Sequence, residues 1–143
     1  METPDSEFGA AVRRALRTMP AAAHLGLRVG ALTPGAAELV LAVRPEHTQH
    51  DGHVAGSVLG ALADFAGGSA AGTLLPPGWT SMTMDYTVKL LAPARGDTVL
   101  ARGRVVRAGR STSVAAADVV VLDSGTETMS ATALITMRNL EVG

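Results

Sequence analysis

The chain has 143 residues, a formal net charge of −1 and no cysteine. This length fits one domain, and the near-neutral charge excludes nucleic acid as the main partner. The lack of thiols excludes disulfides, zinc–thiolate sites and cysteine nucleophiles. Hydrophobic residues make up 47% of the chain but aromatic residues only 3%. Because a core of Ala, Val and Leu buries little area per residue, we expect stabilisation by assembly into a homodimer or homotetramer.

Two sequence features argue against a membrane location. No uninterrupted apolar stretch approaches the ~18 residues that a bilayer-spanning helix needs. The first 20 residues carry early acids and lack the apolar centre of a signal peptide. We therefore expect a cytoplasmic protein with no membrane partner.

The N-terminal third predicts a helix followed by two strands. Residues 1–24 form an N-terminal helix and lead-in, and residues 25–143 form the single domain. The helix covers residues 6–19, with Ser6 as N-cap and Pro20 as its end. The strands cover residues 25–32 and 36–44, separated by a Thr-Pro-Gly turn and followed by a polar loop over residues 45–53.

Residues 54–75 form the one long apolar run, which Pro76, Pro77 and Gly78 end. The run is too long for a strand and hydrophobic nearly all round, so it predicts a buried helix. Four strands follow, over residues 80–91, 98–108, 112–122 and 128–138, with hairpin turns at Gly109-Arg110 and Ser124-Gly125. One helix wrapped by a curved antiparallel sheet is an α+β fold.

The strand over residues 80–91 alternates between two faces. Strict alternation puts Met84 and Tyr86 on one face and Thr83 and Asp85 on the other.

Glycines form a row along one side of the predicted buried helix. At a spacing of four residues the row reads Gly56, Gly60, Asp64, Gly68, Gly72. Each interior glycine costs roughly 0.5–1 kcal/mol relative to alanine. Close approach of another group would explain this cost, and either a second helix or the chain of a ligand fits the row.

Asp64 is the one acid in this helix. An unpaired carboxylate in an apolar site is expensive, so Asp64 must be hydrogen-bonded, paired or beside a wet cavity. A structural role would have it accept a hydrogen bond from a hydroxyl such as that of Thr83. A functional role would make it a general base or nucleophile.

Three segments together resemble one enzyme family. Residues 49–64 read QHDGHVAGSVLGALAD, residues 83–94 read TMDYTVKLLAPA before Gly96-Asp97, and residues 103–111 read GRVVRAGRS. The ordered set resembles the phenylacetic-acid-degradation-type (PaaI-type) hot-dog thioesterases and spans nearly the whole domain. The resemblance implies a hot-dog fold, with one long helix wrapped by about five to six strands. It also implies hydrolysis of an acyl-CoA with an aryl or short-to-medium chain, without a cofactor or metal.

The resemblance also implies site residues shared between subunits. Asp64 is the expected catalytic carboxylate, and Thr83 holds water against it. Gly56 donates its backbone N–H to the thioester carbonyl, and Gln49 orients the thioester or the water. In this family the Gln49 and Gly56 positions come from one subunit and the Asp64 and Thr83 positions from its partner.

One position departs from the family pattern. Many relatives have His before the glycine, where this chain has Ala55. Because any residue can supply a backbone amide, the carbonyl-polarising group is retained. The hairpin after residue 106 is the expected contact with the CoA phosphates, since Arg suits phosphate oxygens; its residues are Arg107, Gly109, Arg110 and Ser111.

Other readings of these residues remain open. His47, His50, Asp51 and His53 could form a metal site, although their spacing matches no standard zinc pattern. A hydratase of the same fold would need a paired Asp and His that this loop does not reproduce. A non-catalytic acyl-CoA binding protein is the main alternative, because a fold alone does not determine function.

Overall fold

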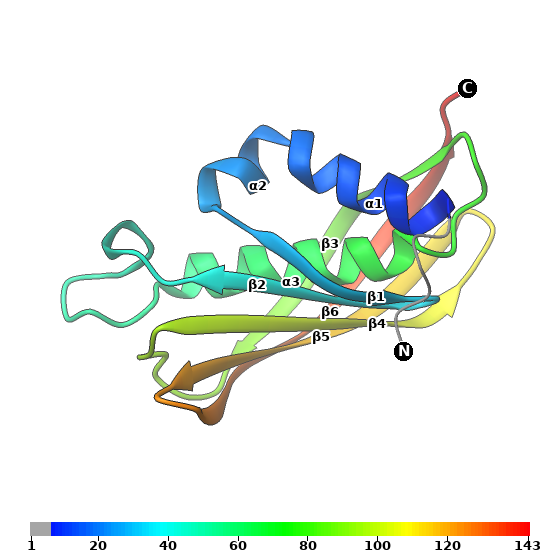
Figure 1. The fold of residues 1–143 in the computed structure, drawn as a ribbon. Coiled ribbons are helices and arrows are strands. Elements are labelled where there is room, and N and C mark those ends of the chain that lie inside the picture. Colours follow the sequence, from blue (N-terminus) through cyan, green and yellow to red (C-terminus); the bar gives the residue numbers. More distant parts are fainter. Residues whose placement is uncertain (1–6) are drawn as a thin grey trace.

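The computed structural model describes residues 7–143, so the proposed N-cap Ser6 lies outside the described part. Two short N-terminal helices precede a sheet of six strands, and one long helix lies between the second and third strands (Figure 1). The elements are α1 Glu7–Thr18, α2 Pro20–Leu25, β1 Arg28–Thr33, β2 Ala36–Ala42, the 3-10 turn η1 Pro45–His47, α3 Gly56–Gly72, β3 Trp79–Leu90, β4 Thr98–Ala108, β5 Thr112–Asp123 and β6 Thr126–Glu141.

All strand pairs are antiparallel, in the order β1-β2-β4-β5-β6-β3. Helix α3 packs against one face of this sheet, and α1 lies on the far side of α3 from β4 and β5 (Figure 1). The predicted α+β arrangement of one long helix and an antiparallel sheet is therefore confirmed. β1 and β3 are the two edge strands.

Small side chains bring α3 very close to the sheet. Ala63, Ala66 and Ala70 of α3 are fully buried, as are Ala101, Ala115 and Ala117 beneath them. On β4, a Cβ added to Gly103 would lie 2.3 Å from the carbonyl oxygen of Ala66. Only glycine at this position permits the observed distance between helix and strand, so the Ala-rich core is a condition of close packing.

The structure corrects the sequence prediction around Pro20. This proline ends α1 but also starts α2, where it occupies the first turn. Proline is well suited there, because its missing N–H would be unpaired anyway. Gly26 ends α2 in the left-handed conformation, with φ 81°. The first strand therefore begins at Arg28 and not at residue 25.

A β-bulge breaks the expected alternation of β3. Thr83 pairs with Met137 and Asp85 with Thr136, so that Met84 is the extra residue between them. As a result Thr83 and Tyr86 share the face towards α3, and the prediction that they lie on opposite faces is wrong. The hairpin between β5 and β6 agrees with prediction, since Ser124 (φ 50°) and Gly125 (φ 86°) form its two-residue turn.

The close approach at Gly103 makes a stability prediction. We expect Gly103→Ala to lower the free energy of unfolding by about 1–3 kcal/mol, because the methyl group must push α3 off the sheet. Gly68→Ala is the matched control: its methyl group would meet no atom within 4 Å. It should stabilise by about 0.5–1 kcal/mol through helix propensity. Urea unfolding of both variants at one protein concentration measures the difference, and equal stabilities would contradict the packing argument.

Candidate active site

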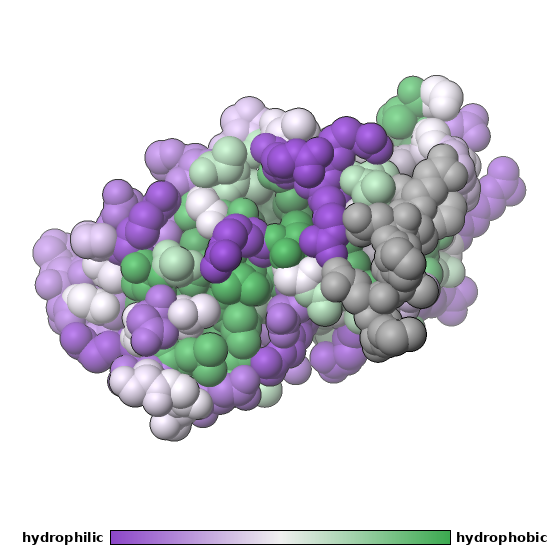
Figure 2. Space-filling view, in the orientation of Figure 1, coloured by the Kyte–Doolittle hydropathy of each residue, from purple (hydrophilic) through white to green (hydrophobic). Residues whose placement is uncertain are grey.

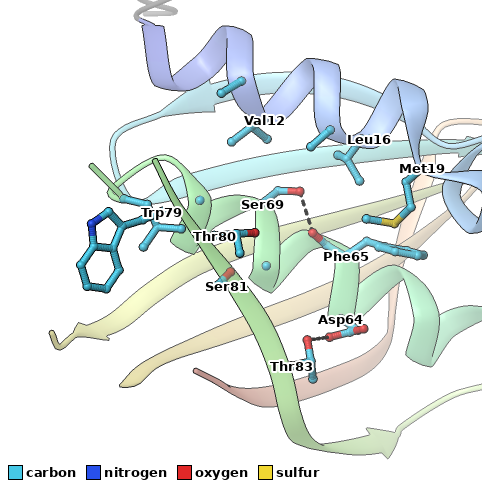
Figure 3. Close-up of a pocket in the computed structure, with 15 residues that line it drawn as sticks. Val12, Leu16, Met19, Asp64, Phe65, Ser69, Trp79, Thr80, Ser81 and Thr83 are labelled. Atoms are coloured by element: carbon cyan, nitrogen blue, oxygen red, sulfur yellow. Dashed lines mark hydrogen bonds between the residues drawn. The ribbon is translucent and has the colours of Figure 1, made fainter. Parts of the chain in front are cut away.

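Asp64 and Thr83 form a direct pair within one chain. The Thr83 hydroxyl donates a hydrogen bond of 2.7 Å to Asp64 Oδ1 (Figure 3). Asp64 lies on α3 and is half-buried, and Thr83 lies on β3. The bulge after Thr83 turns this hydroxyl towards α3. Within the described chain no partner is recorded for Asp64 Oδ2, so one carboxylate oxygen is held and the other is available.

A cavity of about 330 Å³ begins at this pair, and we call it the α1–α3 cavity. Asp64, Phe65, Gly68 and Gly72 of α3 line one side, and apolar residues of α1 line the side opposite (Figure 3). The remaining walls come from β3 and the segment before it: Leu75, Trp79, Thr80, Ser81 and Thr83. The pair is thus the polar edge of a mainly apolar cavity.

The glycine row proves to have several neighbours. A Cβ on Gly60 would touch Tyr86 and Val88 of β3, and one on Gly72 would lie 3.1 Å from Val12 of α1. Gly68 faces open space in the α1–α3 cavity. Within one chain, therefore, Gly60 faces side chains of β3, Gly68 faces the α1–α3 cavity, and Gly72 faces helix α1.

Gln49 and Gly56 lie at a second cavity of about 440 Å³, the loop cavity. Leu90 to Ala94, after β3, form its other side. The loop lies at one end of the molecule (Figure 1), and Figure 2 shows mainly hydrophilic residues there. The His53 N–H and its ring hold Asp51, with 2.7 Å between His53 Nδ1 and Asp51 Oδ2. These contacts, first of all the hydrogen bond from the His53 N–H, lower the pKa of Asp51, so its carboxylate is ionised at neutral pH.

Gly56 is the first residue of α3, where backbone N–H groups have no intrahelical acceptor. In the described part of the chain no backbone partner is recorded for its N–H. Its position opposite Leu90 is tight, since an added Cβ would lie 2.8 Å from a Leu90 methyl carbon. The Gly56 amide is therefore a free donor at the positive end of the helix dipole.

The four predicted catalytic residues thus form two pairs. Asp64 and Thr83 meet at one cavity, and Gln49 and Gly56 line the other. Asp64 lies eight residues after Gly56 on the same helix, which corresponds to about 12 Å along the axis. One thioester cannot contact both groups within one chain.

The histidine loop gives no sign of a metal centre. No cluster of three possible ligands occurs within residues 7–143. His47 is buried: its Nδ1 accepts from the Arg44 N–H, and its Nε2 lies 2.8 Å from the Leu25 carbonyl oxygen. His47 therefore anchors the loop to the end of α2.

None of the helices within residues 7–143 could span a bilayer.

The arginines of β4 fall into two groups. Arg102 pairs with Glu38 and Glu127, and Arg104 lies 3.5 Å from Asp118. Arg107 and Arg110, at the β4–β5 hairpin, are exposed, and no ion pair is recorded for either within the described chain. A role of this hairpin, with Gly109 and Ser111, in binding the CoA phosphates therefore stays a prediction.

Sequence reasoning missed two elements of these cavities and one contact of the loop beside them. Helix α1 lines the cavity beside Asp64, Leu90 covers Gly56, and Arg95 donates to the Asp51 carbonyl oxygen. The sequence predicted this helix, but it did not indicate what the helix covers. No local signal marks Leu90 or Arg95, because both act through tertiary contacts.

Comparison with known proteins identifies the family of this chain. The family model of the thioesterase superfamily matches residues 51–128. A protein of Halobacterium salinarum named as an esterase is 36% identical over 101 residues, which are 67% of this chain and 66% of that protein. This chain thus spans slightly less than two thirds of that relative.

Solved structures extend the similarity to the whole fold. A thioesterase family protein from Silicibacter pomeroyi has a TM-score of 0.91 and 30% identity, covering 94% of this chain and 98% of that one. A phenylacetic-acid-degradation-related protein from Ralstonia eutropha has a TM-score of 0.76 and 26% identity, covering 89% and 98%. The resemblance to PaaI-type proteins and the hot-dog fold are confirmed. The chain belongs to the thioesterase superfamily, a family of thioester hydrolases.

Proposed function

We propose that this protein hydrolyses acyl-CoA thioesters, with Asp64 as general base or nucleophile. The observation that carries the proposal is the Asp64–Thr83 pair at the edge of an apolar cavity. Thr83 fixes Oδ1, which leaves Oδ2 to take a proton from water or to attack the thioester carbon. A carboxylate held in this way, with one free oxygen, suits general-base or nucleophilic chemistry.

The Gly56 amide supplies the second half of the chemistry. As water or the carboxylate adds to the carbonyl carbon, negative charge develops on its oxygen. A free N–H at the start of α3 stabilises that charge. The carbon–sulfur bond then breaks. When water attacks, its oxygen stays on the acyl group, which leaves as the free acid, and the proton that Asp64 took passes to the CoA thiolate. When the carboxylate attacks, CoA leaves as the thiolate and the acyl group stays on Asp64 as a mixed anhydride; water then splits the anhydride into free acid and Asp64 carboxylate and supplies the proton for the thiol. Gln49, on the same cavity as Gly56, would orient the thioester or the water.

Assembly of two copies would bring the two pairs together. β3 is an edge strand, which has no strand partner on its outer side among residues 7–143, and most of its residues are exposed. Its exposed fractions reach 59% for Met82, 54% for Met84 and 58% for Leu90. An apolar exposed edge favours pairing with a second strand. Antiparallel pairing of two β3 strands would set Asp64 of each copy towards Gly56 of the other.

Release of free thiol from several acyl-CoAs is the direct test of this function. Steady turnover supports the enzyme, and tight binding without turnover would support the non-catalytic acyl-CoA binder instead.

The first prediction for the site concerns Asp64. Asp64→Asn keeps the shape and the contact with Thr83 but removes the base, so turnover should fall by at least ~100-fold. Affinity for the ester and the melting temperature should change little. Asp123→Asn is the matched control, because Asp123 is exposed at the β5–β6 turn. A near-native rate for Asp64→Asn would make Asp64 a structural residue.

The second prediction concerns sharing of the site between subunits. Asp64→Asn and Gln49→Ala each damage a different half-site, so both parent proteins should be slow. Random reassortment makes half of the dimers mixed, and each mixed dimer has one intact site. Mixed refolding should therefore restore about one quarter of native activity. Activity no greater than the mean of the two parents would show that each site lies within one chain.

The third prediction concerns CoA recognition. Arg110 is exposed on the hairpin, and loss of a charge-assisted contact with phosphate should raise KM for acyl-CoA by about tenfold in Arg110→Ala. The KM for the matching acyl-pantetheine, which lacks the nucleotide, should not change. Arg28→Ala, an exposed arginine at the start of β1, is the control. An unchanged KM for acyl-CoA would exclude a role for Arg110.

A further inference from the structure

We propose that the α1–α3 cavity holds the acyl group and that Gly68 sets the length it accepts. This inference rests on the proposed thioesterase function, and it identifies the substrate class. The cavity starts at the Asp64–Thr83 pair and extends along α3 over Gly68 to Gly72. An acyl chain whose carbonyl carbon lies at Asp64 would therefore enter the cavity directly.

The size of the cavity limits the acyl group. Its volume of about 330 Å³ is at the lower end of the range for small-molecule pockets, which is roughly 300–1,000 Å³. Figure 3 shows Trp79 near one end and Met19 with Phe65 near the other. Where α1 approaches Gly72, Val12 closes the space between the helices. The cavity therefore suits a short-to-medium aliphatic chain or a single ring.

The chemistry of the walls selects an uncharged, apolar acyl group. Val12 and Leu16 project from α1 towards α3 (Figure 3), and Phe65, Leu75 and Trp79 complete the apolar lining. The Ser69 hydroxyl is already engaged, since it donates to the Phe65 carbonyl oxygen at 2.7 Å. Among the described lining residues Asp64 is the one charged side chain. An acyl group ending in a carboxylate would meet a like charge and no cation, so such substrates should be rejected.

Gly68 lies at the centre of the α3 wall, one turn after Asp64. A Cβ at Gly68 would meet no atom within 4 Å, whereas one at the neighbouring Gly67 would lie 2.8 Å from Ile135. Gly67 is thus required by packing, and Gly68 is not. Any side chain at position 68 would project into the cavity and shorten it without pressing on the core.

Helix α1 forms the opposite wall, and polar contacts hold it in place. The Arg13 side chain donates to the carbonyl oxygen of Gly30 at 3.1 Å and to that of Val29 at 3.4 Å. These bonds tie α1 to β1, the strand at the far edge of the sheet from β3. Leu16 points from α1 into the space over α3 (Figure 3). Gly68 lines the opposite wall, so truncation of Leu16 should enlarge the same cavity.

The test measures kcat/KM for butanoyl-, hexanoyl-, octanoyl- and decanoyl-CoA. In Gly68→Leu the octanoyl-to-butanoyl ratio should fall by about tenfold or more, because the new side chain fills the space that the longer chain needs. Leu16→Ala should have the opposite effect and raise kcat/KM for the longer esters, up to decanoyl-CoA, relative to butanoyl-CoA. Gly60→Ala is the matched control, because its methyl group would touch Tyr86 and Val88 outside the cavity. In native protein, succinyl-CoA should be a far poorer substrate than butanoyl-CoA.

A binding measurement separates this inference from the proposed function. Trp79 is the one tryptophan of the chain and lines the cavity, so its emission reports the occupant. In an Asp64→Asn background, the same esters are titrated with and without Gly68→Leu. A shift in chain-length preference for binding, without turnover in native protein, would support the cavity and defeat the enzyme. Turnover with an unchanged octanoyl-to-butanoyl ratio in Gly68→Leu would support the enzyme and overturn the inference.

Discussion

The short distance between α3 and the sheet is the constraint on which the rest of the structure depends. Gly103 and the buried alanines on both sides allow the helix backbone to rest almost on the strands. This contact fixes the position of α3 on β4, and it thereby also fixes where Asp64 lies relative to β3. Dispersion contacts between small groups are individually weak, but they are dense here. They therefore hold the helix in one well-defined position on the sheet.

The opposite side of α3 has no such uniform packing. There its glycine row meets β3 near Gly56 and Gly60, open space at Gly68 and α1 near Gly72. The same helix is therefore densely packed on one side and borders a cavity on the other. Its first residue offers a free N–H, and its middle carries the acid. These groups lie about 12 Å apart on one helix, which is the distance that the proposed assembly of two copies would bridge.

Much of this fold could be predicted from periodicity and turn residues. The long apolar run gave α3, and β4 spans the same residues, 98–108, in prediction and structure. Pro20 was misread because proline both ends one helix and begins the next. The family resemblance identified Asp64 and Thr83, which the structure brings together. It could not identify the wall that α1 provides, because the segments that carry the resemblance lie outside α1 and a local sequence does not show which element a helix packs against.

The bulge at Met84 also has a consequence for how this strand can change in evolution. It divides β3 into two segments whose side-chain directions are set independently, one carrying Thr83 and the other Tyr86, Val88 and Leu90. Insertion or loss of one residue elsewhere in the strand would invert the facing of a whole segment. At the bulge, removal of Met84 would leave Thr83 and Tyr86 two residues apart, so simple alternation would keep both on the face towards α3. The shared facing of Thr83 and Tyr86 therefore survives loss of the bulge residue, whereas the facing of Val88 and Leu90 depends on the length of β3 after Tyr86.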